Sequence, residues 1–365
     1  MPPSFAVSAA LPSYKRRSVL DGHSEWVKHL AVSPDSQWVA TASGDNTVIL
    51  WTARYGRVAR AWLAHLGSAR CVAFSPDSTR LASVGDDSLV VVWSVSTDKQ
   101  LAALAGHTGK VCTCAWSPDG ALLVSGAEDG TVRVWDAQTY APVRTFSDLG
   151  AKVAFLAFSP DGRWLGACAE HHPCRFWEVE NRDMVLRHTK EAFVVAGNHM
   201  AVAFDPASTK VATTSADRFR VQVWDLASGE LHLNLKRKGK FAGRVEFSPN
   251  GQLLVTAADD MFGTMEIWDV SSGEAVRAFE GHRDELYAAC FSPDGRHLLS
   301  ASWDETIRLW RVEDGVCVAV LTDHNDPVVC ARFTPDGEMI ASGDRRGGVS
   351  IRSVRFLIAH GGGLT

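Results

Sequence analysis

Four segments of the 365-residue sequence carry a histidine, a serine or threonine, an aspartate and a tryptophan at matching spacings. A hydroxyl beside an imidazole that a carboxylate orients is the arrangement that nucleophilic hydrolases use. An active site is built once, however, whereas this set recurs along the chain. The recurrence favours hydrogen bonds that satisfy buried polar groups over catalysis. The four sets are His23, Thr41, Asp45 and Trp51; His65, Ser83, Asp87 and Trp93; His107, Ser125, Asp129 and Trp135; and His282, Ser300, Asp304 and Trp310.

The segments that carry these sets are themselves repeats. Eight turns that resemble Ser-Pro-Asp-Gly begin 42 to 46 residues apart, at Ser33, Ser75, Ser117, Ser159, Asp205, Ser248, Ser292 and Thr334. A second series of positions follows in step, at Trp51, Trp93, Trp135, Trp177, Trp224, Trp268, Trp310 and, in the eighth place, Arg352. Two series in one register indicate a tandem repeat.

Each repeat contains short apolar runs separated by turns. One run precedes the Ser-Pro-Asp-Gly turn, as at Val111–Trp116, and a second follows it, as at Leu122–Ser125. A third run alternates up to the tryptophan, and a fourth precedes the next repeat, as at Val143–Phe146. Four short antiparallel strands per repeat predict the blade of a β-propeller.

These motifs resemble those of the WD-repeat β-propeller family over nearly the whole chain. The early Gly-His pair of that family stands at Gly22-His23, Gly106-His107 and Gly281-His282. The late Trp-Asp pair stands at Trp135-Asp136, Trp224-Asp225 and Trp268-Asp269. The resemblance implies that each His, hydroxyl, Asp and Trp set forms a structural chain of hydrogen bonds. It also implies an interaction scaffold rather than an enzyme.

Counting the repeats predicts an all-β fold: one eight-bladed propeller of four-stranded antiparallel blades at residues 17–353. Residues 1–16 are expected to form a flexible N-terminal arm, and residues 354–365 a C-terminal tail. A strand at Arg17 to Leu20 would pair with Val349–Arg352 and close the ring, which removes an open sheet edge. Seven blades with an extra unit is the alternative.

The remaining four repeats depart from the His–Asp pattern. Blade 8 keeps His324 but has Arg346 at the aspartate position. We expect blades 4 to 6 to be the softer arc of the ring, because buried polar networks that are satisfied rigidify their surroundings. At the histidine and aspartate positions, blade 4 has Leu149 and His171, blade 5 has Val195 and Arg218, and blade 6 has Lys238 and Phe262.

Composition excludes several classes of protein. Hydrophobic residues make up 46% and charged residues 22%, and the formal net charge of −5 gives no general attraction to nucleic acid or to an anionic membrane. No apolar run is long enough to span a bilayer. The eight cysteines are expected to be reduced core residues of an intracellular, cytoplasmic protein, and we expect a monomeric propeller.

Two further motifs have a structural alternative. Cys168, His171, His172 and Cys174 are of the types that bind zinc, but one tight turn cannot easily place four ligands tetrahedrally. We expect a turn of blade 4 with exposed imidazoles, and neither a metal nor a cofactor. The basic run 236–240 is a candidate phosphate contact or import signal, and is expected to be a solvated loop.

The loops before the innermost strands and the turns between the second and third strands lie on one face of such a ring. Aromatic and basic side chains concentrate on this face in blades 7, 8 and 1, and such side chains dominate binding hot spots. These side chains are predicted to bind a protein or peptide, and an acidic or phosphorylated segment is the candidate ligand. The alternative is that each aromatic side chain packs against its own blade and takes no part in binding. The predicted partner-binding residues are Trp26, Lys28, Tyr287, Trp303, Arg345 and Arg346 in these blades, together with Arg70 in blade 2 and Phe241 in blade 6.

Two other functions compete with the scaffold. An enzyme that uses the central channel would need inward carboxylates or histidines from several innermost strands. The innermost segments at residues 30–32, 71–73 and 153–155 are apolar, which argues against an enzyme. The third hypothesis is a ligand-sensing domain of a longer signalling or regulatory protein.

Overall fold

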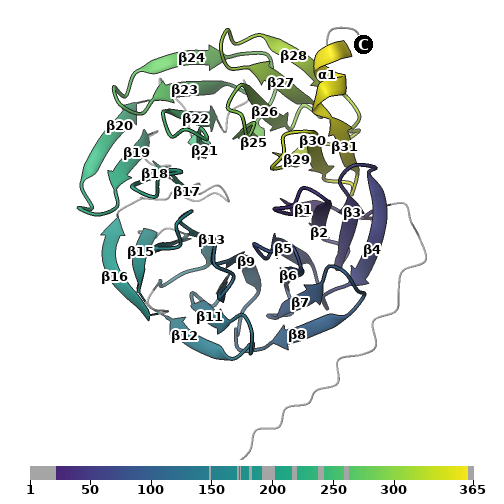
Figure 1. Cartoon of the computed structure of the whole chain (residues 1–365), viewed down its shortest axis with the longest axis vertical. Coiled ribbons are helices and arrows are strands. Elements are labelled where there is room, and N and C mark those ends of the chain that lie inside the picture. Colours follow the sequence, from purple (N-terminus) through teal and green to yellow (C-terminus); the bar gives the residue numbers. More distant parts are fainter. Residues whose placement is uncertain are drawn as a thin grey trace, which may run out of the picture.

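The computed structural model forms a ring of eight antiparallel sheets around a central axis (Figure 1). The structure describes residues 22–147, 149–170, 172, 174–180, 183–190, 202–215, 220–236, 242–258 and 263–360. Within these residues seven sheets have four strands in sequence order and the eighth has three. The eight-bladed, all-β prediction is therefore confirmed, and the seven-blade alternative is wrong.

The first four blades follow one another along the chain, and each begins at the central channel. Blade 1 consists of β1 (Val27–Val32), β2 (Trp38–Ser43), β3 (Thr47–Thr52) and β4 (Arg57–Leu63). Blade 2 consists of β5 (Ala69–Phe74), β6 (Arg80–Gly85), β7 (Val90–Ser94) and β8 (Gln100–Leu104). Blade 3 consists of β9 (Val111–Trp116), β10 (Leu122–Ala127), β11 (Val132–Asp136) and β12 (Pro142–Phe146). Blade 4 consists of β13 (Val153–Phe158), β14 (Trp164–Ala169), β15 (Cys174–Glu180) and β16 (Asp183–Lys190).

The second half of the ring repeats this order. Blade 5 consists of β17 (Val202–Phe204), β18 (Lys210–Ser215), β19 (Arg220–Asp225) and β20 (Leu231–Lys236). Blade 6 consists of β21 (Ala242–Phe247), β22 (Leu253–Ala258), β23 (Met265–Asp269) and β24 (Ala275–Phe279). Blade 7 consists of β25 (Leu286–Phe291), β26 (His297–Ser302), β27 (Ile307–Arg311) and β28 (Cys317–Leu321). Blade 8 consists of β29 (Val328–Phe333), β30 (Met339–Asp344) and β31 (Val349–Ser353), and α1 (Val354–His360) follows it.

The turn between the first and second strands owes its shape to the repeated Ser-Pro-Asp sequence. In blade 1 the Ser33 hydroxyl donates to Asp35 Oδ1 at 2.6 Å and accepts the Trp38 N–H at 2.9 Å. In blade 3 the fourth residue of the turn is Gly120, whose φ of +68° is a left-handed conformation that glycine adopts without strain. Equivalent hydroxyl bonds reverse the chain at the same place in the other blades, except that in blade 5 the Asp205 carboxylate accepts the Thr209 and Lys210 N–H groups.

Neighbouring blades are tied together at these turns and through apolar side chains. The Asp35 N–H donates to Ser78 Oγ at 3.1 Å, which joins blade 1 to blade 2. The Asp336 N–H donates to Ser36 Oγ at 3.0 Å, which joins blade 8 to blade 1. Ala341 of blade 8 packs in one buried cluster with Leu30 and Trp51 of blade 1. The ring is therefore closed by direct contacts between its last and first described blades.

The eighth blade departs from the expected pattern at its outer side. The strand at residues 17–20 that was predicted to pair with β31, and the predicted arm at 1–16, lie outside the described residues. The first part of the predicted C-terminal tail is helical: Val354 and Leu357 of α1 are buried in a cluster with Leu321 and Ile340. The tail segment at 354–360 thus packs on blades 7 and 8.

Candidate functional site

The histidine, hydroxyl, aspartate and tryptophan sets form buried hydrogen-bonded chains inside blades 1, 2, 3 and 7. In blade 2, His65 Nδ1 lies 2.9 Å from Asp87 Oδ1 and His65 Nε2 lies 2.9 Å from Ser83 Oγ. The Trp93 indole N–H donates to the same serine oxygen at 2.9 Å. The corresponding chains run through His23, Thr41, Asp45 and Trp51; His107, Ser125, Asp129 and Trp135; and His282, Ser300, Asp304 and Trp310.

The geometry of these chains excludes a nucleophilic role for the hydroxyls. Thr41, Ser83, Ser125 and Ser300 are each fully buried, so a substrate has no access to their oxygens. Each oxygen already accepts an indole N–H, which lowers its value as a nucleophile. The chains therefore satisfy polar groups inside each blade, in agreement with the structural role that the repeat spacing predicts.

The electrostatics of the chains follow from burial and hydrogen bonding. Burial alone would raise the pKa of Asp129, but hydrogen bonds from Thr131 and from the Thr108 N–H hold it at about 2. Burial lowers the pKa of His107, and the Asp129 carboxylate opposes that shift. The aspartate is therefore ionised over the physiological pH range and anchors the chain.

Blade 8 has a chain that the sequence analysis missed. His324 Nδ1 lies 2.8 Å from Asp344 Oδ2, and His324 Nε2 lies 2.8 Å from Ser342 Oγ. The expected aspartate position holds Arg346, but Asp344, two residues earlier, supplies the carboxylate from the end of β30. Arg346 instead donates its backbone N–H to Asp344 Oδ1 at 2.9 Å. The prediction that blade 8 lacks the His–Asp pair was wrong. It looked for the aspartate only at 22 residues after the histidine, whereas in blade 8 the aspartate lies 20 residues after His324.

Blades 5 and 6 keep half of the chain, and blade 4 has an apolar replacement. The Trp224 indole donates to Thr213 Oγ1 and the Trp268 indole donates to Thr256 Oγ1, both at 3.0 Å. Leu149, at the histidine position of blade 4, is buried in the apolar core. The other departures noted in the sequence, His171, Val195, Arg218, Lys238 and Phe262, lie outside the described residues.

Four of the predicted partner-binding side chains come together where blades 7, 8 and 1 meet. The Arg345 guanidinium carbon lies 5.2 Å from the ring centroid of Trp26 and 4.6 Å from that of Trp303. The rings of Trp303 and Tyr287 are 5.4 Å apart. We call Trp26, Tyr287, Trp303 and Arg345 the aromatic–arginine cluster. Arg345 is exposed, and 38% of Trp26 is accessible to solvent.

Two of the other predicted basic residues, Arg70 and Arg346, are already paired with carboxylates. Arg70 bonds Asp86 and lies 3.4 Å from Glu128 of blade 3. Arg346 lies 3.0 Å from Asp326. Lys28 is partly buried, and its burial together with the Arg70 charge lowers its pKa. Phe241, the remaining predicted residue, lies outside the described residues.

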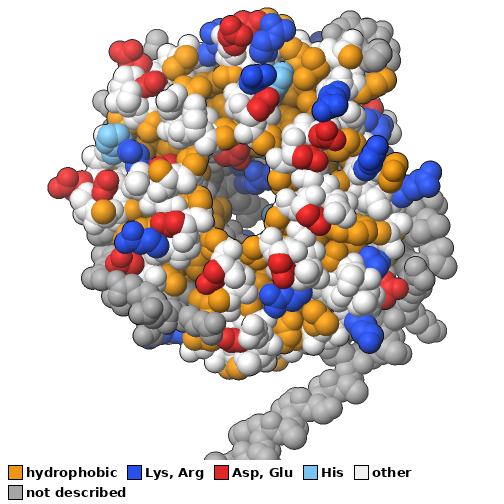
Figure 2. All heavy atoms as spheres, viewed as in Figure 1, with side chains coloured by type: hydrophobic (Ala, Val, Ile, Leu, Met, Phe, Trp, Pro, Cys, Tyr) orange, Lys and Arg blue, Asp and Glu red, His pale blue; other side chains and the backbone are white. Residues whose placement is uncertain are grey.

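The central channel carries charged side chains that the sequence analysis overlooked. A cavity of about 180 Å³ opens between the innermost strands of blades 1, 4, 5, 6, 7 and 8, and the hollow is visible at the centre of Figure 2. Arg332 Nη1 donates to Glu246 Oε2 at 3.0 Å, and Arg244 Nε donates to the Tyr287 carbonyl at 2.8 Å. The expectation of uncharged innermost strands holds for the three segments on which it was based and fails for β21 and β29.

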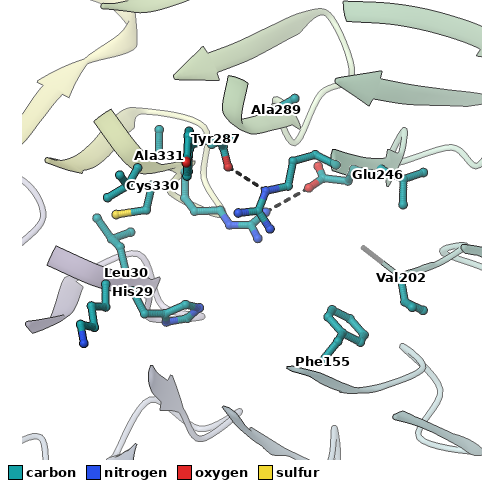
Figure 3. A pocket seen from close by; sticks show the side chains of 15 residues that line it. His29, Leu30, Phe155, Val202, Glu246, Tyr287, Ala289, Cys330 and Ala331 are labelled. Atoms are coloured by element: carbon teal, nitrogen blue, oxygen red, sulfur yellow. Dashed lines mark hydrogen bonds and ion pairs between the residues drawn. The ribbon is translucent and has the colours of Figure 1, made fainter. Parts of the chain in front are cut away.

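Few carboxylate and imidazole groups line the described part of this channel (Figure 3). Among the described residues that line the cavity, Glu246 is the one carboxylate and His29 the one histidine. In the described part of the chain there is no cluster of three or more histidine, cysteine or carboxylate side chains that fits a metal ion. Burial raises the pKa of Glu246, and Arg332 opposes the shift.

The cysteines differ from the expectation in one pair. Cys168, at the end of β14, and Cys174, at the start of β15, are joined in a disulfide, whereas the other six are free thiols. The two strands pair side by side in blade 4, which brings the sulfurs together across the hairpin. The disulfide occupies two of the four side chains of the zinc alternative, so that ligand set is not available.

No helix in the described residues is both long and apolar enough to cross a membrane.

The chain matches known repeat proteins at the level of family and fold. The family model described as "WD domain, G-beta repeat" matches residues 14–52, 56–94, 98–136, 273–311 and 315–353, together more than half of the chain. The WD repeat and SOCS box-containing protein 1 of Homo sapiens is 31% identical over 96 residues, which are 26% of this chain and 22% of that protein. The WD repeat-containing protein 1 of Bos taurus is 45% identical over 71 residues, which are 19% of this chain and 11% of that protein.

A solved structure supports the architecture independently. The crystal structure of the computationally designed Ika8 protein matches with a TM-score of 0.79 and 24% sequence identity, over 92% of this chain and 98% of that chain. At this identity the match establishes the fold alone. The matched segment spans about a fifth of the human relative and about a tenth of the bovine one. The repeats, the eight sheets and the family match show that the chain belongs to the WD40 repeat family, whose propellers are generally non-enzymatic scaffolds for protein interactions.

Proposed function

We propose that the protein is a non-enzymatic scaffold that binds a protein or peptide through the aromatic–arginine cluster. The observation that carries the proposal is the position of Arg345, whose guanidinium faces the rings of both Trp26 and Trp303. Side chains from three blades meet there and leave aromatic surface open to solvent. Tryptophan, tyrosine and arginine are the residues that most often supply binding energy in protein interfaces.

The chemistry of the cluster favours a partner segment with both a negative and an apolar group. The Arg345 guanidinium carbon lies over two indole rings, and the N–H groups of a guanidinium suit a carboxylate or phosphate in two-point contact. The exposed part of Trp26 offers area to an apolar anchor. Arg70 and Arg346 are paired within the protein, so we expect them to shape the charge around the cluster rather than to bind the partner directly.

The same proposal includes a monomeric propeller in the cytoplasm. Six of the eight cysteines are free thiols, which supports a reducing compartment. The Cys168–Cys174 disulfide joins residues in one hairpin of blade 4, distant in sequence from the cluster.

The test compares capture of partners from native extract by the wild type and by a Trp26→Ala, Trp303→Ala variant. Tyr55→Ala is the matched control, because Tyr55 is 67% exposed and lies in the turn between β3 and β4 rather than in the cluster. A partner that the wild type and Tyr55→Ala retain should be lost by the double variant. Its measured affinity should fall about thirtyfold or more, the equivalent of about 2 kcal/mol for a buried aromatic anchor.

Arg345→Glu separates the contribution of charge from that of aromatic area. Reversing this charge should mainly slow association and alter its dependence on salt. All variants should keep the unfolding free energy of the wild type, because the cluster lies outside the buried chains. A partner that binds the Trp26→Ala, Trp303→Ala variant with unchanged affinity would show that recognition occurs elsewhere on the ring.

A further inference from the structure

The Cys168–Cys174 disulfide lies at the tip of the hairpin of β14 and β15, in a different blade from the residues of the aromatic–arginine cluster (Figure 1). The register of β14 against β15 pairs Ala167 with Arg175, so the two cysteines form the next pair toward the turn. Both cysteines are fully buried, and they share an apolar cluster with Val202 of blade 5. The bond therefore joins two strands of blade 4 beside its junction with blade 5.

The same place in other blades holds two apolar side chains. In blade 1 the register pairs Ala42 with Val48, and in blade 2 it pairs Val84 with Val90. All four of these side chains are fully buried. A free cysteine packs as a small hydrophobic residue, so two reduced thiols also fit this place. Blade 4 can therefore keep its fold whether the bond is formed or broken.

Blade 4 has apolar residues where blade 2 has its polar chain. Leu149 and Ala167 stand at the histidine and hydroxyl positions, and both are buried in the apolar core of the blade. In blade 2, the Asp87 carboxylate at the hairpin tip bonds His65 and accepts the Leu66 N–H at 2.9 Å, which ties the tip to the loop before β5. The disulfide therefore restrains a hairpin tip that has neither the imidazole nor the hydroxyl of such a chain.

The other contacts of this tip are noncovalent and partly exposed. Lys152 Nζ donates to Glu170 Oε1 at 2.8 Å, and 27% of each side chain is exposed. The Glu170 N–H donates to the Lys152 carbonyl at 2.9 Å. Ion pairs near the surface contribute little to stability. Within the described residues, breaking the disulfide leaves these two contacts as the hydrogen-bonded ties between the tip and the preceding loop.

The short loop that the bond closes keeps its coupling to folding small. Cys168 and Cys174 are six residues apart. The stabilisation that a disulfide gives by restricting the unfolded chain grows with loop length, so it is smallest for short loops. Because the two effects form one thermodynamic cycle, the fold favours the disulfide over the dithiol only to the same small extent. The other six cysteines are free thiols, as expected where small thiols are abundant.

We propose that Cys168 and Cys174 are a redox couple: their disulfide fastens the tip of the blade 4 hairpin, and its reduction by a small thiol such as glutathione releases the tip. When the tip opens, a glutathione thiolate attacks one sulfur, the S–S bond breaks, and the other cysteine leaves as a thiolate that takes up a proton. A second glutathione displaces the first from the mixed disulfide. The protein gains two electrons and two protons, and the two glutathiones leave as glutathione disulfide.

Equilibration of the whole native protein in glutathione buffers of increasing reduced fraction measures this couple. After acid quenching, alkylation in denaturant and digestion with trypsin, residues 164–175 form one peptide that contains Cys168, Cys174 and no other cysteine. Mass spectrometry separates its disulfide form from its doubly alkylated form. We expect conversion between the two forms over the glutathione ratios that lie between oxidising and reducing compartments, with an unchanged far-ultraviolet circular dichroism spectrum.

Hydrogen exchange on the oxidised and reduced forms measures the release of the tip. Reduction should raise the exchange rate about tenfold at the ends of β14 and β15 next to the cysteines, and should leave the matching hairpin of blade 3, β10 and β11, unchanged. A Cys168→Ala, Cys174→Val variant is the matched control, because it gives blade 4 the apolar pair that blade 1 has at Ala42 and Val48. This variant should exchange at the same rate in both buffers.

Three results would each overturn the proposal. The peptide 164–175 could remain a dithiol in the most oxidising buffer, or remain a disulfide in the most reducing buffer while the protein stays folded. The two forms could also exchange at equal rates in β14 and β15. If the double variant fails to fold, the two forms of the wild type still decide the question, because their comparison needs no substitution. None of these results bears on partner binding by the aromatic–arginine cluster.

Discussion

Replacing Ser83 by alanine should lower the unfolding free energy by about 2–6 kcal/mol, because this hydroxyl has two buried partners. The Trp93 indole donates to Ser83 Oγ at 2.9 Å, and His65 Nε2 lies at the same distance. A buried polar group that loses its partner costs about 1–3 kcal/mol, and the substitution leaves two such groups. The oxygen is fully buried, so water cannot take its place without entering the blade.

Equilibrium urea unfolding, followed by tryptophan fluorescence and by far-ultraviolet circular dichroism, measures this change. Thr213→Val in blade 5 is the matched comparison, because its hydroxyl accepts the Trp224 indole but has no histidine of this kind. That variant should lose about 1–3 kcal/mol, roughly half of the Ser83 effect. Ser96→Ala, at an exposed turn, should change stability by less than about 0.5 kcal/mol.

Two outcomes would contradict the reasoning about Ser83. If Ser83→Ala lowers the unfolding free energy no more than Ser96→Ala does, the hydrogen-bonded chain of blade 2 contributes nothing to stability. Its recurrence in other blades would then need another explanation. If Ser83→Ala and Thr213→Val cost the same, the indole bond accounts for the whole effect and the histidine adds nothing. Coincident transitions from the two spectroscopic probes are needed for either conclusion, because repeat proteins can unfold in parts.

Three other predictions concern pH, ring closure and local stability. Hydrogen bonds hold the pKa of folded Asp129 at about 2, below its ordinary value of 3.8, so the unfolded state binds more protons. The unfolding free energy should therefore fall as pH drops from about 4 to about 2, and Asp129→Asn should flatten that part of the profile. Deleting residues 1–20 should lower the melting temperature, because a strand at 17–20 is predicted to cover the outer edge of β31; a truncated protein as stable as the parent contradicts this. Hydrogen exchange should be faster at residues 150–270 than in blades 1 to 3, because blades 1 to 3 contain complete hydrogen-bonded chains from aspartate to tryptophan. Uniform protection around the ring would contradict this prediction.

The repeat spacing predicted the architecture because it reports interactions within one blade. The Ser-Pro-Asp turn and the buried chain from His65 to Trp93 each depend on residues of a single repeat, so their spacing is preserved when the repeat is copied. The same reasoning failed in blade 8, where His324 bonds a carboxylate 20 residues later rather than 22. A strict spacing rule detects only those repeats whose turn has the common length.

Contacts between blades could not be predicted in this way. Arg332 and Glu246 are 86 residues apart and meet across the channel, past the innermost strand of blade 7. Arg70 was predicted to supply free positive charge, but Asp86 and Glu128 neutralise it from its own blade and the next one. These pairings depend on which side chains the curvature of the ring brings together. That information is not contained in the period of a repeat.

The aromatic–arginine cluster and the lining of the central channel are physically connected through Tyr287. Its ring packs on Trp303 at 5.4 Å, while its backbone carbonyl accepts the Arg244 Nε–H at 2.8 Å. Tyr287 lies at the register shift between Leu286 and Ala288 in the pairing of β25 with β26, so its ring and its carbonyl belong to an irregular point of the strand. A partner that displaces the Tyr287 ring therefore acts next to the group that orients Arg244. The outer face and the central channel therefore share this one residue, so a change at Tyr287 affects both.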